Sequence, residues 1–521
     1  MITERAASPR HPNRAFAVLF LLEMWERFGY YGMASLLVLY MVQQRHFGDA
    51  RADFVWGAFS ALVYSVPMLG GWLGDHVLGL RRTMVLGAVT LGAGYLLLSV
   101  PLAAALFPAM GLIALGNGLF KVNPNNLVSR LHEGDHSRLD ILFTLYYISL
   151  QVGSFVSILL LPWIKDHPGW IITLGPLRFD SWHLAFGVNA IGLTLGLVNY
   201  GLFREYLRPY GAAPDFEPLR ARTLLAVLLA ALPLAALVSE VIRHRAATLA
   251  AVGLSALLLI YIFAHLLLTG GRGGRNRVIA CVVFTFISII WALYNQQIYT
   301  SLTLFALRNV RHSLLGQHVS PAQFQDLNQF WLMVLAMPLA WLYARKASSR
   351  GGDFSLAGKF TAGLYMLALA FFLYAASRLT ARHGVTSPWW LVAGYGAQSL
   401  GELLISALSF SMVSKLVPER SRGLVMGGWF LGVGLSNYAG GAIAALARIP
   451  AGAITPVESL PVYTHLFAWL GVGALAAALV ATALVPWLDR LTVGSAEPAS
   501  PRAPGHPERE AAPLTESPRR D

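Results

Sequence analysis

The chain alternates between long apolar runs and short polar segments. A helix needs about 20 apolar residues to cross roughly 30 Å of hydrocarbon, and runs of this length recur from residue 15 to residue 488. The pattern predicts fourteen membrane-spanning helices, at residues 15–42, 53–77, 83–101, 104–128, 139–163, 182–203, 221–239, 247–269, 277–306, 327–344, 357–377, 387–414, 423–446 and 462–488.

Composition supports a membrane protein. Of 521 residues, 56% are hydrophobic and 12% are charged, whereas soluble domains carry about 25% charged residues. The net charge of +13 would suit nucleic acid, but the basic residues lie in short loops, so membrane topology explains them better and we expect no nucleic-acid partner. The single cysteine, Cys281, excludes an intrachain disulfide and indicates no redox compartment.

The distribution of basic residues predicts the orientation. With the N-terminus inside, 22 Lys and Arg fall on the inner side and 11 on the outer side. This bias places both termini in the cytoplasm. The first residues show no cleavage site for a signal peptide, and the Pro-rich tail at 491–521 is expected to be disordered and cytoplasmic.

Two similar segments suggest an internal repeat. Leu-Val-Ser-Arg-Leu at 127–131 is echoed by Met-Val-Ser-Lys-Leu at 412–416, each at the cytoplasmic end of a predicted span. A five-residue echo can arise by chance, but a repeat would give two six-helix bundles with a substrate site between them. We predict a cytoplasmic N-terminus (1–14), a first bundle (15–205), a linker with two extra spans (206–272), a second bundle (273–490) and the tail (491–521).

The first span contains three charges where the membrane makes charge costly. Helical geometry places Glu23, Glu26, Arg27 and Tyr30 on one face, with Glu23 and Arg27 at the favourable i,i+4 spacing. A structural ion pair between helices is the plain alternative. Three charges within five residues leave one acid without a local partner, however, and such a carboxyl can carry a proton.

Two isolated charges lie at similar depth in the two halves. The echoed segments align Lys121 with Glu402 to within about one helical turn, which would place a cation and an acid on opposite walls of a central cavity. An extended di- or tripeptide spans roughly 7–10 Å, so its carboxylate could bind Arg27 and Lys121 and its ammonium group Glu402. The alternative is a Lys121–Glu402 salt bridge without a ligand role, or one that a ligand opens.

The first span also carries a family motif. The run Glu23-Met-Trp-Glu26-Arg27-Phe28-Gly-Tyr30-Tyr31 matches ExxERFxYY, and the chain resembles the proton-dependent oligopeptide transporters of the major facilitator superfamily. Further matches extend this resemblance over nearly all of residues 15–490. It implies an all-α major facilitator fold with two bundles of six helices. The extra pair resembles that of many bacterial members, and this likeness implies a location in a bacterial inner membrane.

The resemblance also implies roles for individual residues. Glu23, Glu26 and Glu402 would serve proton coupling, and Glu402 would also bind the peptide. The other expected peptide-binding residues are Arg27, Tyr30, Tyr64, Lys121, Gln151, Asn295, Asn328 and Trp429. The loop after the second span resembles a cytoplasmic latch formed by Asp75, Arg81 and Arg82.

Three positions depart from the family pattern. One is Ala407, which stands where a proline is common, and the other two are expected site residues. Gln151 stands in place of an asparagine, and Asn295 stands where many members have an acid. An ionic pair between Asn295 and Lys121 is therefore impossible, which puts the family's extracellular latch in doubt.

Together these observations predict a proton-coupled symporter of di- and tripeptides that works as a monomer within membrane lipid. It needs no cofactor or metal, since the proton is the coupling ion. Within the same fold, a nitrate or drug carrier is the alternative. A membrane-embedded transferase or hydrolase would need a nucleophile with its base or a metal cluster, and the sequence shows neither, so we expect no enzyme.

Overall fold

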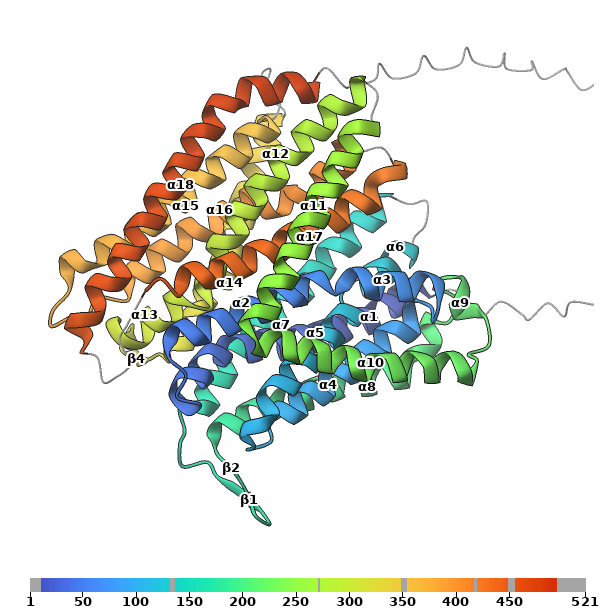
Figure 1. Cartoon of the computed structure of the whole chain (residues 1–521), viewed down its shortest axis with the longest axis horizontal. Helices are drawn as coiled ribbons and strands as arrows, with labels where there is room; N and C mark the ends of the chain where they lie inside the picture. The colour runs from blue at the N-terminus through green and yellow to red at the C-terminus, as the bar shows by residue number, and fades with distance from the viewer. Residues whose placement is uncertain are drawn as a thin grey trace, which may run out of the picture.

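The computed structural model describes residues 11–131, 136–269, 272–347, 354–416, 419–447 and 455–493 (Figure 1). Most of the tail predicted to be disordered therefore lies outside the described residues. The described part is mainly helical, as predicted. It also contains two short antiparallel hairpins, β1 (Ile172–Leu174) with β2 (Leu177–Phe179) and β3 (Ser313–Leu314) with β4 (Gln317–His318), in segments expected to be loops.

The helices form two bundles, as predicted (Figure 1). The first contains α1 (Pro12–Leu39), α2 (Asp49–Ser65), α3 (Pro67–His76), α4 (Leu80–Leu98), α5 (Leu106–Phe120), α6 (Asn123–Leu131), α7 (His136–Lys165) and α8 (Ser181–Phe203). The second contains α12 (Arg272–Asn295), α13 (Ser301–Asn309), α14 (Asp326–Ala347), α15 (Leu356–Ala376), α16 (Trp389–Leu416), α17 (Glu419–Ala444) and α18 (Pro456–Val493).

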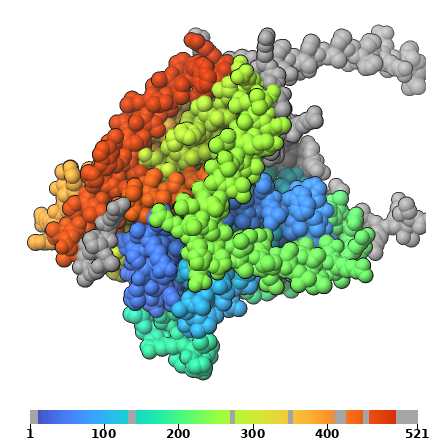
Figure 2. Space-filling view, in the orientation of Figure 1, coloured from blue at the N-terminus to red at the C-terminus, as the bar shows by residue number. Residues whose placement is uncertain are grey.

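Three further helices lie between the bundles in sequence: α9 (Ala213–Phe216), α10 (Ala221–Arg243) and α11 (Arg245–Thr269). Helix α10 packs against α5 of the first bundle, and α11 packs against α17 of the second. Figure 2 shows this green pair lying over both the blue and the orange parts of the molecule. The extra helices thus connect the bundles along one side, while the exact domain boundaries stay a prediction.

Three predicted spans are interrupted. The span at 53–77 breaks between α2 and α3, the span at 104–128 between α5 and α6, and the span at 277–306 between α12 and α13. Pro67 begins α3 at the first of these breaks, where a missing amide hydrogen costs least. The apolar pattern runs through such breaks because neighbouring helices can satisfy the freed backbone groups.

Ten helical segments within the described residues are long and apolar enough to cross a membrane. The predicted spans at 15–42, 83–101, 387–414 and 423–446 are not among these ten. Helix α1 differs from them because Glu23, Glu26 and Arg27 lie close together in it. The count of fourteen spans therefore stays a prediction.

Asp180 fixes the start of α8 against the end of the first helix. Its carboxylate accepts hydrogen bonds from the backbone amides of Trp182 and His183 and from the Gln44 side chain, the last over 2.8 Å. Partial burial alone would raise the pKa of Asp180, but the hydrogen bonds from His183 and Trp182 outweigh it and hold the pKa below its usual value. This carboxylate is a helix cap in its ionised form.

Candidate functional site

Helix α1 carries a buried cluster of two acids and one arginine. Arg27 Nε lies 3.3 Å from Glu23 Oε1, which confirms the predicted i,i+4 pair, and it also contacts Glu26. All three residues are at most 5% exposed. The prediction that one acid lacks a local partner is wrong, because both carboxylates share one guanidinium. When both acids are ionised, the cluster carries one net negative charge.

The cluster has hydrogen-bonding capacity left over. Asn117 of α5 donates to Glu26 Oε1 over 3.3 Å, and the Arg27 guanidinium lies 5.6 Å from the centre of the Tyr30 ring. Within the described part of the chain, Arg27 Nη2 is buried without a hydrogen-bond partner. Because an unpaired buried donor is unfavourable, Arg27 Nη2 is ready to bind a further acceptor.

Lys121 lies in the break between α5 and α6. Its Nζ is 3.8 Å from the centre of the Tyr64 ring on α2, a cation–π contact. The helices approach closely here because Gly118 has no side chain, and a Cβ would lie 2.2 Å from the Val66 side chain. Among the described acids, Glu23 and Glu26 interact electrostatically with Lys121, but neither forms an ion pair with it.

Glu402 lies on α16 of the second bundle and is held by an asparagine. Asn328 of α14 donates to Glu402 Oε2 over 3.1 Å and to Ser399 Oγ over 3.0 Å. The predicted alternative, a salt bridge between Glu402 and Lys121, is absent from the ion pairs of the described residues. Asn328, predicted to contact a peptide, thus binds the acid expected to hold the peptide's ammonium group.

Three tyrosines of the first bundle interact with Glu402 of the second bundle. Tyr31 of α1, Tyr64 of α2 and Tyr147 of α7 all interact electrostatically with Glu402, and the first two also interact with Arg27. The sequence did not lead us to predict Tyr31 and Tyr147 as site residues, although Tyr31 is the last residue of the ExxERFxYY motif. The arrangement places cations on one bundle and an acid on the other around a tyrosine-lined region.

The remaining predicted binding residues have local partners or buried positions. Gln151 donates to the Tyr147 hydroxyl over 3.0 Å, so it belongs to the same region. Trp429 on α17 is 4% exposed and lies 5.3 Å from the Phe430 ring, centre to centre. Asn295 ends α12, and its Oδ1 is buried without a hydrogen-bond partner in the described residues.

The basic residues at the start of α4 pair with an acid that the sequence did not single out. Arg81 Nε lies 3.4 Å from Asp215 Oδ1, and Arg82 donates to the Pro214 carbonyl over 3.0 Å. Asp215 also accepts from the Leu80 amide over 2.7 Å and so caps α4. Asp75, expected to share this latch, is exposed and forms no ion pair among the described residues. The part of Asp75 in the latch stays a prediction.

The opposite end of the molecule holds an ion pair between the bundles. Arg308 of α13 contacts both carboxylate oxygens of Asp49 at the start of α2, and Arg308 Nη2 lies 2.8 Å from Asp49 Oδ1. The Tyr463 hydroxyl of α18 accepts from Arg308 over 2.6 Å. Asp49 is 8% exposed. The missing acid at Asn295 therefore does not leave this end without an ionic contact.

Further contacts join the bundles nearby. Trp56 of α2 donates to Gln296 Oε1 over 2.8 Å, in the helical turn that follows α12. Asn437 of α17 donates to the Ser60 carbonyl of α2 over 3.4 Å. In Figure 1 the bundles meet near α13, whereas α9 and the C-terminal end of α18 lie far apart. The two bundles are thus joined at one end.

Two helical bundles, with opposite charges on facing walls and contacts at one end, define a transporter of the major facilitator type. The model of the POT family matches residues 81–457, and the chain belongs to this family. This confirms the resemblance to proton-dependent oligopeptide transporters that the ExxERFxYY motif indicated.

Similar proteins share almost the full length of the chain. Dipeptide and tripeptide permease B of Yersinia enterocolitica is 40% identical over 488 residues, which cover 93% of this chain and 96% of that protein. Dipeptide and tripeptide permease A of Escherichia coli is 36% identical over 482 residues, with 92% and 93% covered. Membership of this family confirms a multi-pass inner-membrane transporter rather than an enzyme.

Solved structures are similar over the same length. The crystal structure of tetrameric PepTSo2 has a TM-score of 0.82 and 39% identity, covering 92% of this chain and 100% of that one. A structure of the peptide transporter POT in complex with sulfate has a TM-score of 0.78 and 28% identity, with 92% and 96% covered. Because PepTSo2 is described as tetrameric, the monomer expected here stays a prediction.

Proposed function

We propose that the protein imports di- and tripeptides across the inner membrane by symport with protons. The observation that carries the proposal is the Arg27 guanidinium shared by Glu23 and Glu26, on the bundle that faces Glu402. The names of the similar permeases support the substrate class. The proton is the coupling ion, and the mechanism needs no cofactor.

A zwitterionic peptide suits the charges of the site. Its carboxylate binds Arg27, through the unpartnered Nη2, and Lys121, while its ammonium group binds Glu402. Tyr30 lies beside the carboxylate because its ring packs against Arg27. The other predicted side chains surround the peptide backbone and side chains: Tyr64, Gln151, Asn295, Asn328 and Trp429.

Proton coupling follows from competition for Arg27. With both acids ionised, two carboxylates hold the guanidinium, and a peptide carboxylate would add a third negative charge. Protonation of Glu23 or Glu26 neutralises one competitor and leaves Arg27 with a single ionised partner. The peptide carboxylate then binds Arg27 with the cluster near electrical neutrality, so that peptide and proton are favoured to bind together.

Alternating access requires that each side closes in turn. The bias of basic residues places the N-terminus in the cytoplasm, so the Asp49–Arg308 pair lies on the periplasmic side. In this conformation the pair, together with the Trp56–Gln296 hydrogen bond, closes the periplasmic end. The site would then open to the cytoplasm, and the bundles would rock about the midplane.

The function is tested by uptake into liposomes that contain the purified protein. We expect an inward proton gradient to drive accumulation of dialanine above its equilibrium level. A protonophore should remove the accumulation but leave peptide exchange. No accumulation under a gradient would overturn symport.

The substrate class is tested by competition. An excess of dipeptide should block labelled dialanine uptake, whereas single amino acids, nitrate and sugars should leave it unchanged. Competition by nitrate or by an apolar drug, without competition by dipeptides, would instead favour the alternative carrier.

Asp49→Asn should weaken the periplasmic closure. The substitution removes the charge that Arg308 contacts with two nitrogens, and a hydrogen bond to a charged group contributes about 1.5–3 kcal/mol. We therefore expect the population with an open periplasmic end to rise by roughly tenfold or more. Spin labels at Arg51 and Gln317, measured by pulsed electron resonance, should show a longer distance in the variant.

Glu240→Gln is the matched control for Asp49→Asn. Glu240 lies near the periplasmic end of α10, and its ion pairs with Arg243 and His244 are exposed and lie around one helix end. We expect its distance distribution to equal that of the wild type. An unchanged distribution in the Asp49→Asn variant would show that the Asp49–Arg308 pair does not hold the bundles together.

A further inference from the structure

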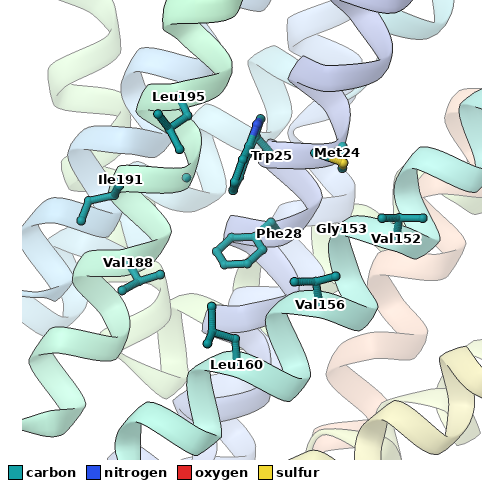
Figure 3. Close-up of a pocket in the computed structure, with 11 residues that line it drawn as sticks. Met24, Trp25, Phe28, Val152, Gly153, Val156, Leu160, Val188, Ile191 and Leu195 are labelled. Atoms are coloured by element: carbon teal, nitrogen blue, oxygen red, sulfur yellow. The ribbon is translucent and has the colours of Figure 1, made fainter.

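An apolar groove opens on the outer surface of the first bundle, away from the charged site. It lies between α1, α7 and α8 and has a volume of about 310 Å³, within the range of small-molecule sites. Figure 3 shows side chains of α1 between those of α7 and α8. Its lining includes Trp25, Phe28, Val152, Val156, Ile191 and Leu195.

The walls of the groove are exposed to the membrane. Val156 is 46% exposed and Ile191 is 61% exposed, although both lie well inside helices that span the bilayer. Gly192 leaves the groove open over α1, because a Cβ there would already lie 3.0 Å from the Trp25 and Phe28 rings. A ligand of this groove therefore enters from the hydrocarbon of the bilayer and contacts a hydrocarbon lining.

Two arginines lie at one end of the helices that line the groove. Arg14 is near the start of α1, Arg204 follows α8 directly, and both are exposed. Arg14 donates to the Tyr206 hydroxyl over 3.1 Å, so the two helix ends are neighbours. Exposed arginines at a membrane surface attract anionic lipid headgroups.

The groove begins about one leaflet's length from the two arginines. Trp25 follows Arg14 by eleven residues, and Leu195 precedes Arg204 by nine. A rise of 1.5 Å per residue places the near end of the groove ~14–17 Å from the arginines along the helices, and Phe28 and Ile191 ~20–21 Å from them. The near end thus lies about half of the 30 Å hydrocarbon core from the arginines, so the terminal part of an acyl chain whose headgroup lies at the arginines enters the groove.

We propose that the groove and these arginines form a binding site for one anionic phospholipid, with an acyl chain between α1, α7 and α8 and the phosphate at Arg14 and Arg204. The chain contacts Trp25 and Phe28, which belong to the same turns of α1 as Glu23, Glu26 and Arg27. Bound lipid thus stabilises the position of Glu23, Glu26 and Arg27 through its contacts with their own helix. This lipid site requires that the protein spans the membrane, but it does not require that the transported substrate is a peptide.

The test uses the full-length protein in phosphatidylcholine nanodiscs that contain a trace of phosphatidylglycerol with a photoreactive acyl chain. After illumination, mass spectrometry locates the labelled residues. We expect the label to concentrate on the groove lining. Val156→Trp fills the groove and should lower labelling there by about tenfold, the effect of ~1.4 kcal/mol in binding. Ile191→Trp is a second variant that fills it from the opposite wall.

Val89→Trp is the matched control for the groove, because Val89 on α4 is 52% exposed and does not line it. It should leave the labelling unchanged. Arg14→Gln with Arg204→Gln should remove the preference for phosphatidylglycerol over an equally photoreactive phosphatidylcholine, whereas Arg220→Gln with Arg222→Gln should not. Uniform labelling of all lipid-facing helices, or unchanged labelling in both groove variants, would overturn the proposal. Cross-links from the groove to a second copy of the chain would also overturn it.

Discussion

Glu23→Gln is expected to abolish peptide accumulation driven by a proton gradient while leaving peptide exchange largely intact. Glutamine keeps the size of the side chain and can still accept a hydrogen bond from Arg27, but it can neither ionise nor carry a proton. Arg27 then keeps Glu26 as its single ionised partner, so a peptide carboxylate can bind whether or not a proton is present. Binding survives, and its dependence on the proton is lost.

Liposomes allow the size of this effect to be measured. If one net positive charge enters with each peptide, a potential of 100 mV supplies about 2.3 kcal/mol, which corresponds to roughly fifty-fold accumulation. We expect the variant to remain near onefold, with an exchange rate within about threefold of the wild type.

The control for this prediction is Glu458→Gln, because Glu458 is an acid at the start of α18 that accepts only from Thr455 among the described residues. This variant should accumulate peptide like the wild type. Normal accumulation by the Glu23 variant would assign the proton to another group. Loss of exchange as well would instead assign Glu23 a role in binding or folding.

Glu402→Gln is expected to weaken the uptake of peptides with a free amino group by about thirty-fold or more, since loss of one partner of a buried charge pair costs about 2–5 kcal/mol. Asn328 of α14 donates a hydrogen bond to the Glu402 carboxylate. Glutamine preserves that hydrogen bond in one orientation of its amide but removes the charge that neutralises the ammonium group. The Michaelis constant should therefore rise more than the maximal rate falls.

The blocked peptide N-acetyl-dialanine provides the discriminating substrate. It lacks the ammonium group, so we expect the wild type to transport it poorly and the Glu402 variant to be no worse. The difference between dialanine and N-acetyl-dialanine should shrink from the wild type to the variant. An equal loss for both substrates would indicate that Glu402 acts in proton transfer or in folding rather than in recognition of the amino terminus.

Sequence reasoning located the charged residues well but described their partners less well. The i,i+4 spacing placed Glu23 on Arg27, because helix geometry alone decides that contact. The same reasoning left one acid without a partner, yet Glu26, the immediate neighbour of Arg27, also contacts the guanidinium. Which rotamer a buried arginine adopts depends on the surrounding helices, and local spacing does not contain that information.

Contacts between distant segments were the main omission. Asp215 lies 134 residues from Arg81, and Arg308 lies 259 residues from Asp49. The local sequence around each of these residues is the same as that around any charged residue in a loop at the membrane surface. Only the packing of the linker on the first bundle, and of one bundle on the other, makes these residues into partners.

The sequence by itself determined the membrane-spanning character, most helix positions and the family, because the thickness of hydrocarbon imposes a length and a composition on every span, and because the motif on α1 is local. The tertiary structure alone decided where helices break, as at Lys121, and which charges meet across the bundles. It also decided that Trp25 and Phe28 line a groove on the outer surface of the first bundle. The physical reason is that the bilayer acts on each helix separately, whereas ion pairs and grooves exist only between helices.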